Sequence, residues 1–269
     1  MPGKAESVPG LAVVVITRNE ERNIRQCLEL VKWAEERIVV DSESTDRTVA
    51  IAKECSAKVF TRPFTNYADQ RNFGDQQASC PWVLALDADE RVPPGLKAEI
   101  AEALTQDGAN GYWIPTLDYM FGRAVRHGGW YPQRHLRLYR KSAGRWRGEV
   151  HEEMAVEGKV GYLANPLLHF SHLTISHFVQ KLDRYTSIEG RTLHAQGKGR
   201  AVLNMLFWPP VVFVYKYLLR AGFMDGVRGL VLAVSLSYYW FIKYAKLWEE
   251  EDRQRMKSAG SDESGGDRE

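Results

Sequence analysis

Residues 82–90 read WVLALDADE, a short apolar run that ends in two carboxylates, Asp87 and Asp89. A buried strand that presents two acids, one residue apart, at its exposed end is suited to a hard divalent cation. Mg²⁺ and Mn²⁺ prefer oxygen ligands, and the bound cation can in turn hold a diphosphate. The pattern is weak by itself, because Asp is common in turns. Its meaning depends on the sequence around it.

The composition is that of an ordinary globular protein. Of the 269 residues, 44% are hydrophobic and 26% are charged, which allows one large domain or one domain with an appendage. The net charge of +2 gives no reason to expect nucleic acid as a partner. Cys27, Cys55 and Cys80 are scattered, so we expect a reducing compartment, no disulfide framework and no zinc site. The first ten residues lack the apolar segment of a secretory signal.

Apolar runs alternate with helical patterns upstream of residue 82. Continuous β-branched runs are typical of strands buried on both faces. Alternation of such strands with helices predicts an α/β fold in which helices cover both faces of a mostly parallel sheet. Ser44 or Thr45 could cap the second helix. The expected strands are 11–16, 37–41, 58–60 and 82–86, and the expected helices include residues 24–31, 46–55 and 65–79.

Polar clusters follow three of these strands. They read TRNEE at 17–21, DSESTD at 41–46 and DADE at 87–90. In parallel sheets ligands gather at the carboxyl ends of the strands. The convergence of three polar clusters at one sheet edge therefore predicts a nucleotide site.

Four ordered blocks resemble the family 2 glycosyltransferases, which have a GT-A type, Rossmann-like nucleotide-sugar fold. The likeness covers roughly residues 10–195. A further likeness, to the bacterial lipopolysaccharide-core glucosyltransferase subgroup, lies in residues 128–141, 148–154 and 222–233. The four blocks are VVITRNEE (14–21), VVDSESTDRT (39–48), QRNFG (70–74) and LALDADE (84–90).

The resemblance implies roles for residues near the nucleoside. Thr17, Asn19 and Glu20 would face the nucleoside, and Asp41 would accept a hydrogen bond from the uracil edge. Buried pairing of that kind leaves the wrong base unsatisfied. Alternatively Asp41 only begins a turn. Asp46 more plausibly caps a helix than touches substrate.

The resemblance also implies a diphosphate and metal site. Arg71 and Asn72 match a pair that lies beneath the diphosphate-sugar, although Arg71 could instead be an exposed helix residue. Asp89 is the preferred ligand for Mg²⁺ or Mn²⁺, and Asp87 would contact the ribose, the metal or a metal-bound water. Glu90 could be the solvated start of the next loop.

An inverting transfer needs one carboxylate near the acceptor hydroxyl to accept its proton. Family members often place an acidic pair where this chain has EVHEE at 149–153. We expect Glu152 to be the base and His151 to orient it or to contact the donor phosphate. Glu149 and Glu153 are the alternative bases. The segment could instead be a charged, solvated hairpin that has no catalytic role.

Other candidates were weaker. Trp130, Tyr131, Arg134 and Arg137 could line an acceptor site, since aromatic faces suit sugars and arginine suits phosphates. Arg137 could equally be an outward strand residue. His169 could add a metal ligand, but a neutral histidine without a functional role is the preferred reading.

The C-terminal third contains two uncharged apolar runs, residues 201–215 and 229–242. Both fall short of the ~18–20 residues needed to span a bilayer. Flanking basic and aromatic residues favour helices in the membrane interface. The alternative is a buried helical pair that covers the catalytic domain.

We therefore expect an inverting, metal-dependent transferase that moves a hexose, glucose first, from a UDP-sugar to a lipid-linked saccharide such as lipopolysaccharide inner core. It would lie peripherally on the cytoplasmic face of the inner membrane. A polyprenol phosphate or a protein could be the acceptor instead, and a non-catalytic nucleotide-sugar-binding scaffold is the alternative outside enzymes. The expected division is a flexible N-terminus (1–10), a GT-A domain (11–195), interfacial helices (196–250) and a disordered tail (251–269).

Overall fold

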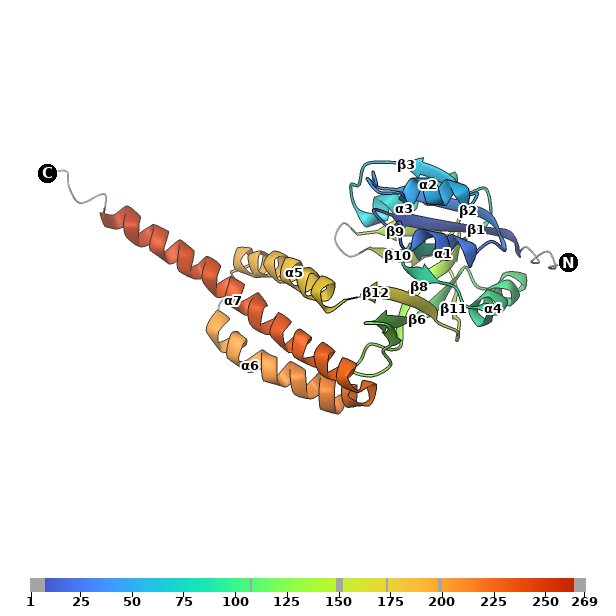
Figure 1. Cartoon of the computed structure of the whole chain (residues 1–269). Coiled ribbons are helices and arrows are strands. Elements are labelled where there is room, and N and C mark those ends of the chain that lie inside the picture. Colours follow the sequence, from blue (N-terminus) through green and yellow to red (C-terminus); the bar gives the residue numbers. More distant parts are fainter. Residues whose placement is uncertain (1–7, 107, 149–151, 173, 198–199, 264–269) are drawn as a thin grey trace. The chain divides into compact units, whose positions relative to one another are not determined.

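The computed structural model describes residues 8–106, 108–148, 152–172, 174–197 and 200–263, and the chain divides into two compact units (Figure 1). Unit 1 comprises Met1–Asp118 and Pro132–Ser171. Unit 2 comprises Tyr119–Tyr131 and His172–Glu269. The division thus falls at His172 rather than at residue 195, and a segment between two strands of unit 1 also belongs to the helical unit.

One half of the main sheet of unit 1 is parallel. Its strands lie in the order β3-β2-β1-β4, and the neighbours run in the same direction. This order brings the carboxyl ends of β1, β2 and β4 together, as the sequence predicts. The strands are β1 (Val8–Thr17), β2 (Ala34–Asp41), β3 (Lys58–Thr61) and β4 (Trp82–Asp87).

The other half is mainly antiparallel and continues from β4 as β8-β6-β12-β5. The pairs β4/β8, β6/β8 and β5/β12 are antiparallel, whereas β11 runs parallel to β6. The predicted α/β fold is confirmed, with a sheet that is mixed rather than mostly parallel. The strands are β5 (Glu90–Arg91), β6 (Gly111–Met120), β8 (Gln133–Arg140), β11 (Val160–Tyr162) and β12 (Leu167–His172), and a separate pair is formed by β9 (Gly144–Arg147) and β10 (Glu153–Val156).

Strand β1 is buried on both faces, and its residues alternate between two apolar clusters. Val13 and Val15 join the cluster that contains residues of three helices, whereas Val14 and Ile16 join the cluster on the opposite face. This period of two explains why the sequence of the strand is continuously apolar. The first cluster includes residues of α1 (Ile24–Glu29), α2 (Thr48–Glu54) and α4 (Pro94–Thr105), and the second includes a residue of α3 (Tyr67–Gln77).

Gly74 lets α3 approach the sheet closely. A Cβ atom at this position would lie 2.4 Å from Cγ1 of Val14 and 3.0 Å from Cγ2 of Val40. Arg71 and Asp75 lie three residues before and one residue after Gly74, and both are buried on α3. The absence of a side chain at Gly74 therefore lets α3 lie close enough to the sheet for Arg71 to reach Asp87 at the end of β4.

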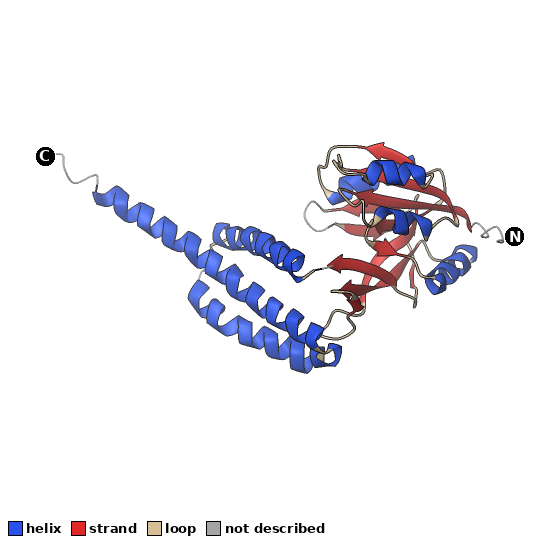
Figure 2. Cartoon of the chain, viewed as in Figure 1, coloured by secondary structure: helices blue, strands red, loops and turns tan. Residues whose placement is uncertain are grey.

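Unit 2 is almost wholly helical (Figure 2). The segment Tyr119–Tyr131 packs on the helices of unit 2 through a small apolar core. This core consists of Met120, Val125, Phe178, Leu182 and Leu232. Its elements are β7 (Arg123–Ala124), α5 (Ile175–Ala195), α6 (Ala201–Phe213), the π-helix η1 (Val214–Leu219), the 3₁₀-helix η2 (Gly222–Asp225) and α7 (Val227–Glu263).

Helix α6 continues through Pro209 and Pro210, where the sequence suggests a break. Proline removes backbone donors, and the hydroxyl of Ser237 donates to the carbonyl of Pro209 at 2.7 Å. Among the described residues, one helical stretch, Ala201–Leu219, is long and apolar enough to cross a membrane by length and composition. The expectation that both apolar runs are too short is therefore corrected for the first run. Helix α7 extends to Glu263, so part of the expected disordered tail (251–269) is helical, and residues 264–269 lie outside the described residues.

Candidate donor and metal site

The loops after β1 and β2 are joined by side chain to backbone hydrogen bonds. Asn19 has a φ of 55° and accepts a hydrogen bond from the backbone of Thr45 at 2.8 Å. Its own N–H donates to the hydroxyl of Ser44 at 2.8 Å. Asp41 is 1% exposed and accepts from the backbone N–H of Ser44 at 2.9 Å and from its hydroxyl. Asp41 and Asn19 thus hold the shape of this edge, as the turn interpretation predicts.

The start of α2 differs from the expected cap. Ser44 is engaged with Asp41, and Asp46 instead accepts from the backbone N–H of Thr48 at 2.9 Å. Asp46 therefore stabilises the helix start, which agrees with its expected role. The backbone of Glu20 donates to the hydroxyl of Thr48 at 2.8 Å, so this turn also anchors the loop after β1.

Thr17 is the last residue of β1, and Glu20 lies in the loop that follows it. The Thr17 hydroxyl is buried and has no hydrogen-bond partner within the part of the chain that the structure describes. Glu20 accepts from the amide of Asn23 at 2.7 Å. Burial raises the pKa of Glu20, and the nearby negative charge of Asp89 adds to the effect. An unpartnered buried hydroxyl is a polar group that a ligand would satisfy.

Asp87 lies between two buried guanidinium groups. Its Oδ1 accepts from Nη2 of Arg71 at 2.7 Å, and its Oδ2 accepts from Nη2 of Arg137 at 2.9 Å. Burial alone would raise the pKa of Asp87, but the charges of Arg71 and then Arg137 hold it well below its usual range. Each oxygen of Asp87 thus accepts from an arginine, and Asp87 orients these two side chains.

Arg71 is 1% exposed, which excludes the interpretation that it is a surface residue. Its guanidinium lies 4.7 Å from the ring centroid of Trp146. The Nε and Nη1 groups are buried and have no hydrogen-bond partner among the described residues. A charged guanidinium with unpartnered N–H groups is a strong donor for phosphate oxygens.

Asn72 acts on the neighbouring strand β9. Its Nδ2 donates to the carbonyl of Trp146 at 2.9 Å, and its Oδ1 accepts from the Trp146 backbone N–H at 3.1 Å. These two bonds fix the residue whose ring covers Arg71. In this structure Asn72 therefore holds Trp146 of β9 against Arg71. The sequence instead predicts that Asn72 itself lies beneath the diphosphate.

Glu90 and Arg137 form a buried pair, which corrects two expectations. Glu90 is 1% exposed rather than solvated, and it accepts from the backbone N–H of Asp87 at 2.8 Å and from Arg137 at 3.1 Å. Burial raises the pKa of Glu90 despite Arg137. Arg137 reaches Asp87 and Glu90 from β8 and is 8% exposed, so it is not an outward residue. Trp130 and Tyr131 belong to unit 2, whereas Arg134 is exposed on β8.

His169 lies beside Asp89, which the sequence reading did not favour. The pairing of β12 with β5 sets His169 opposite Glu90, and the backbone N–H of Phe170 donates to the carbonyl of Asp89 at 2.9 Å. Nε2 of His169 lies 3.4 Å from Oδ2 of Asp89, and Nδ1 lies 2.7 Å from Oδ1 of Asp118. Burial lowers the pKa of His169, but these two acids outweigh it and raise the pKa to about 11.

A divalent cation shared with a substrate would displace the proton from His169, after which Nε2 and the Asp89 carboxylate would both face it. The described residues contain no cluster of three or more His, Cys, Asp or Glu side chains placed to hold a metal. Mg²⁺ and Mn²⁺ sites commonly use one or two protein ligands and fill the remaining positions with water and phosphates. A second acid on the far nitrogen of a ligating histidine, as Asp118 is here, orients such a ligand.

Glu152 lies on the Arg71 side of the site. Its Oε1 is 3.8 Å from Nη2 of Arg71, and its side chain is 25% exposed. Glu153 begins β10 and is exposed. The two other members of this group, Glu149 and His151, lie outside the described residues. Of the two candidate bases that the structure describes, Glu152 is thus the one that lies near the arginine.

Comparisons with known proteins agree with this geometry. A relative from Rhizobium meliloti (strain 1021), lipopolysaccharide core biosynthesis glycosyltransferase LpsC, is 29% identical over 248 residues, which cover 89% of this chain and 92% of the relative. An uncharacterized glycosyltransferase of Rickettsia typhi is 30% identical over 261 residues, with 89% and 87% covered.

Solved structures share the fold. The mannosyltransferase PcManGT from Pyrobaculum calidifontis, in complex with GDP-Man and Mn²⁺, has a TM-score of 0.50 at 14% identity, with 91% of this chain and 89% of that chain covered. The model of the glycosyl transferase family 2 matches residues 12–155, more than half of the chain. The order of the strands, the site at their carboxyl ends and this match together show that the chain belongs to glycosyl transferase family 2.

Proposed function

We propose that this glycosyltransferase transfers a hexose, glucose first, from a UDP-sugar to a lipid-linked saccharide such as lipopolysaccharide inner core. The observation that carries the proposal is the cluster at the ends of β1 and β4, in which Arg71, Asp87 and Glu152 adjoin the pair Asp89 and His169. The name of the Rhizobium relative supports the acceptor class. The uracil base follows from the resemblance at Asp41.

Donor binding would use the groups that are buried without partners. Arg71 offers Nε–H and Nη1–H to phosphate oxygens, and the Thr17 hydroxyl is available to the nucleoside. Asp89 and His169 would hold Mg²⁺ or Mn²⁺, which would supply positive charge to the diphosphate when bound. Mn²⁺ is present with a nucleotide sugar in the mannosyltransferase that shares this fold.

The transfer itself would use one carboxylate of the chain. The acceptor hydroxyl oxygen forms a bond to the anomeric carbon while the bond from that carbon to the diphosphate oxygen breaks. The hydroxyl proton goes to Glu152, and UDP leaves with the bonding electron pair. The unpartnered Nε–H and Nη1–H groups of Arg71 would stabilise the negative charge that develops on the leaving diphosphate.

The acceptor would be reached at a membrane surface on the cytoplasmic side. Helix α6 buries only Ala201, and its large apolar side chains are exposed, including Leu203 at 60%, Leu206 at 67% and Phe207 at 55%. An exposed apolar surface of this kind marks a protein or membrane contact. Basic and aromatic residues near it favour a helix that lies in the membrane interface.

The test is UDP release from a panel of UDP-sugars with Mn²⁺ or Mg²⁺, with wild type compared with Asp89→Asn. Slow hydrolysis of one donor that depends on the metal and is lost in the variant would identify the donor and support the metal ligand. Asp252→Asn, which changes an acid on α7, is the matched control. Equal activity of Asp89→Asn and wild type would refute the metal assignment.

If no donor is hydrolysed, UDP binding on the same samples separates the two remaining outcomes. Binding without hydrolysis means that an acceptor is required, and the panel is then repeated with lipopolysaccharide core, polyprenol phosphate and protein acceptors. Absence of UDP binding refutes the proposed donor.

A further inference from the structure

The turn before Trp130 in unit 2 lies against two basic side chains, Lys216 of η1 and Arg220, which follows η1 directly. The backbone N–H of Gly128 donates to the carbonyl of Arg220 at 2.8 Å. Gly128 and Gly129 have φ values of +67° and +76°, in the left-handed region that favours glycine. A Cβ atom on Gly129 would lie 3.1 Å from Nε of Arg220 and 3.4 Å from Nζ of Lys216. The glycine therefore lets both cations lie directly on the turn.

The two cations lack an acidic partner. Within the described residues, neither Lys216 nor Arg220 has a carboxylate within 4.0 Å. The nearby carboxylate of Asp225 instead accepts from the backbone of His127 at 2.8 Å and lies 3.0 Å from its Nδ1. Partial burial, and then the charge of Arg220, lowers the pKa of Lys216. Two like charges held together without a counter-charge form a site that an anion would stabilise.

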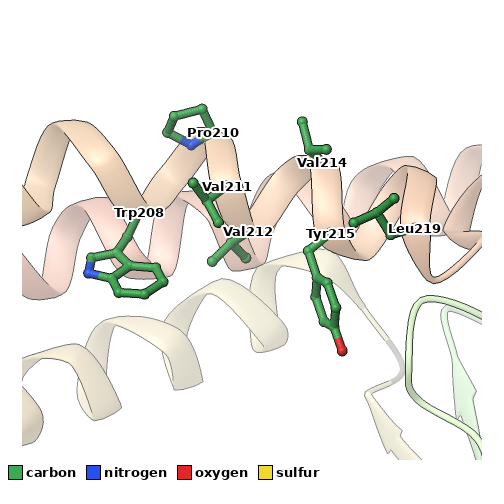
Figure 3. A pocket seen from close by; sticks show the side chains of 7 residues that line it. All are labelled: Trp208, Pro210, Val211, Val212, Val214, Tyr215 and Leu219. Carbon is green, nitrogen blue, oxygen red and sulfur yellow. The ribbon is translucent and has the colours of Figure 1, made fainter.

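An apolar groove runs along the same helix (Figure 3). The groove has a volume of about 550 Å³. Trp208 and Tyr215 project from the same side of the helix (Figure 3). Tyr215 and Leu219, which line the groove, directly precede Lys216 and Arg220 in the chain, although the two cations themselves do not line it. The groove is lined by Trp208, Pro210, Val211, Val212, Val214, Tyr215 and Leu219.

We propose that Lys216 and Arg220 bind the phosphate of an anionic phospholipid and that the α6 groove takes part of its acyl chain. The assignment rests on the membrane contact of the proposed function and adds a specific lipid chemistry to it. Lysine and arginine N–H groups suit phosphate oxygens. A lipid phosphate is chosen over a soluble one because Leu218 and Leu219, beside the pair, are 53% and 73% exposed.

The experiment measures binding of the full-length protein to two kinds of vesicle. One contains phosphatidylcholine alone, and the other contains in addition about one fifth of anionic phosphatidylglycerol. Each basic residue near an anionic surface strengthens binding, so Lys216→Gln with Arg220→Gln is expected to weaken binding to the anionic vesicles about 30-fold. Binding to phosphatidylcholine alone is expected to stay unchanged.

The matched control is Lys181→Gln with Arg184→Gln, which removes the same charge from exposed positions on α5 of the same unit. Its loss is expected to stay within about threefold. An equal loss in both double variants would overturn the site in favour of general surface attraction. Retention of the lipid preference by the Lys216 and Arg220 variant would overturn it too.

Two further outcomes distinguish a failure of the lipid site from a failure of the membrane contact on which it rests. If wild type binds neither vesicle, the membrane contact of the proposed function fails, and the lipid site fails with it. If millimolar inorganic phosphate abolishes the preference for anionic vesicles at constant ionic strength, the site takes soluble phosphate and the lipid assignment is wrong. Unchanged thermal unfolding of both double variants confirms that they are folded.

Discussion

Asp75 allows a prediction about how stability depends on pH. This carboxylate on α3 is 8% exposed, and both its oxygens lie 2.9 Å from the hydroxyl of Tyr139. The hydroxyl in turn accepts from Nε1 of Trp146 at 2.9 Å. One hydroxyl proton is a small compensation for a buried charge, and burial raises the pKa of Asp75 to about 7.

The sign and size of the effect follow from linkage. In the unfolded chain the Asp75 carboxyl has its ordinary pKa of 3.8. Below that pH both states are protonated. As pH rises the unfolded state ionises first, so the free energy of unfolding falls until pH passes about 7, where it levels. Between pH 5 and 8 the fall amounts to about 3 kcal/mol, from two pKa units at about 1.4 kcal/mol each.

Asp75→Asn removes this fall. The free energy of unfolding of the variant, minus that of wild type, should increase by about 3 kcal/mol from pH 5 to pH 8, whatever the constant offset of the substitution. Urea unfolding followed by circular dichroism at several pH values measures the difference. Tyr139→Phe removes the donor that favours the charged form, so the fall should extend to higher pH. Asp252→Asn is the control.

A difference between Asp75→Asn and wild type that stays constant from pH 5 to 8 would refute the reasoning. It would mean that Asp75 ionises in the folded protein without penalty. A difference that is constant from pH 5 to 8 but rises as pH falls below about 4 would mean that the native structure stabilises the carboxylate.

Three other predictions concern packing and the site. Gly74→Ala should destabilise unit 1 by about 1–3 kcal/mol through overpacking against β1 and β2, measured by urea unfolding, with the exposed Gln76→Ala as the control that should not. Asp118→Asn should weaken Mn²⁺ binding about 10–100-fold in a direct titration, since the acid orients His169; unchanged affinity would contradict that role. Glu152→Gln should keep UDP affinity while turnover falls about 10²–10⁴-fold, and a wild-type rate would exclude Glu152 as the base.

The parallel half of the fold was predictable because its information is local. Residues 11–16 and 82–86 are apolar and β-branched enough to read as buried strands, and the polar residues after them fall at the same sheet edge. The family and the fold predicted from these blocks are confirmed. Arg71 was singled out from the resemblance of QRNFG to the family, and the structure shows it buried beside Asp87, while its role toward the diphosphate stays a prediction.

The antiparallel half carried the errors because its contacts join distant residues. His169 reaches Asp89 through the pairing of β12 with β5, about 80 residues apart in sequence, and no spacing reveals such a pairing. Glu90 and Arg137 look like surface residues until β8 is placed beside β4. Their burial follows from tertiary structure, which overrides the usual preference of charged residues for solvent.

The interruption of unit 1 by Tyr119–Tyr131 limits how its C-terminal helices can be exchanged between relatives. A chimaera made by one crossover at His172 would take α5 to α7 from one parent and the turn at His127 from the other. The pairing of His127 with Asp225, and of Gly128 with Arg220, would then be made by residues of different origin. Recombination that preserves both must exchange two segments together, so the turn and the helices are expected to be inherited as one module.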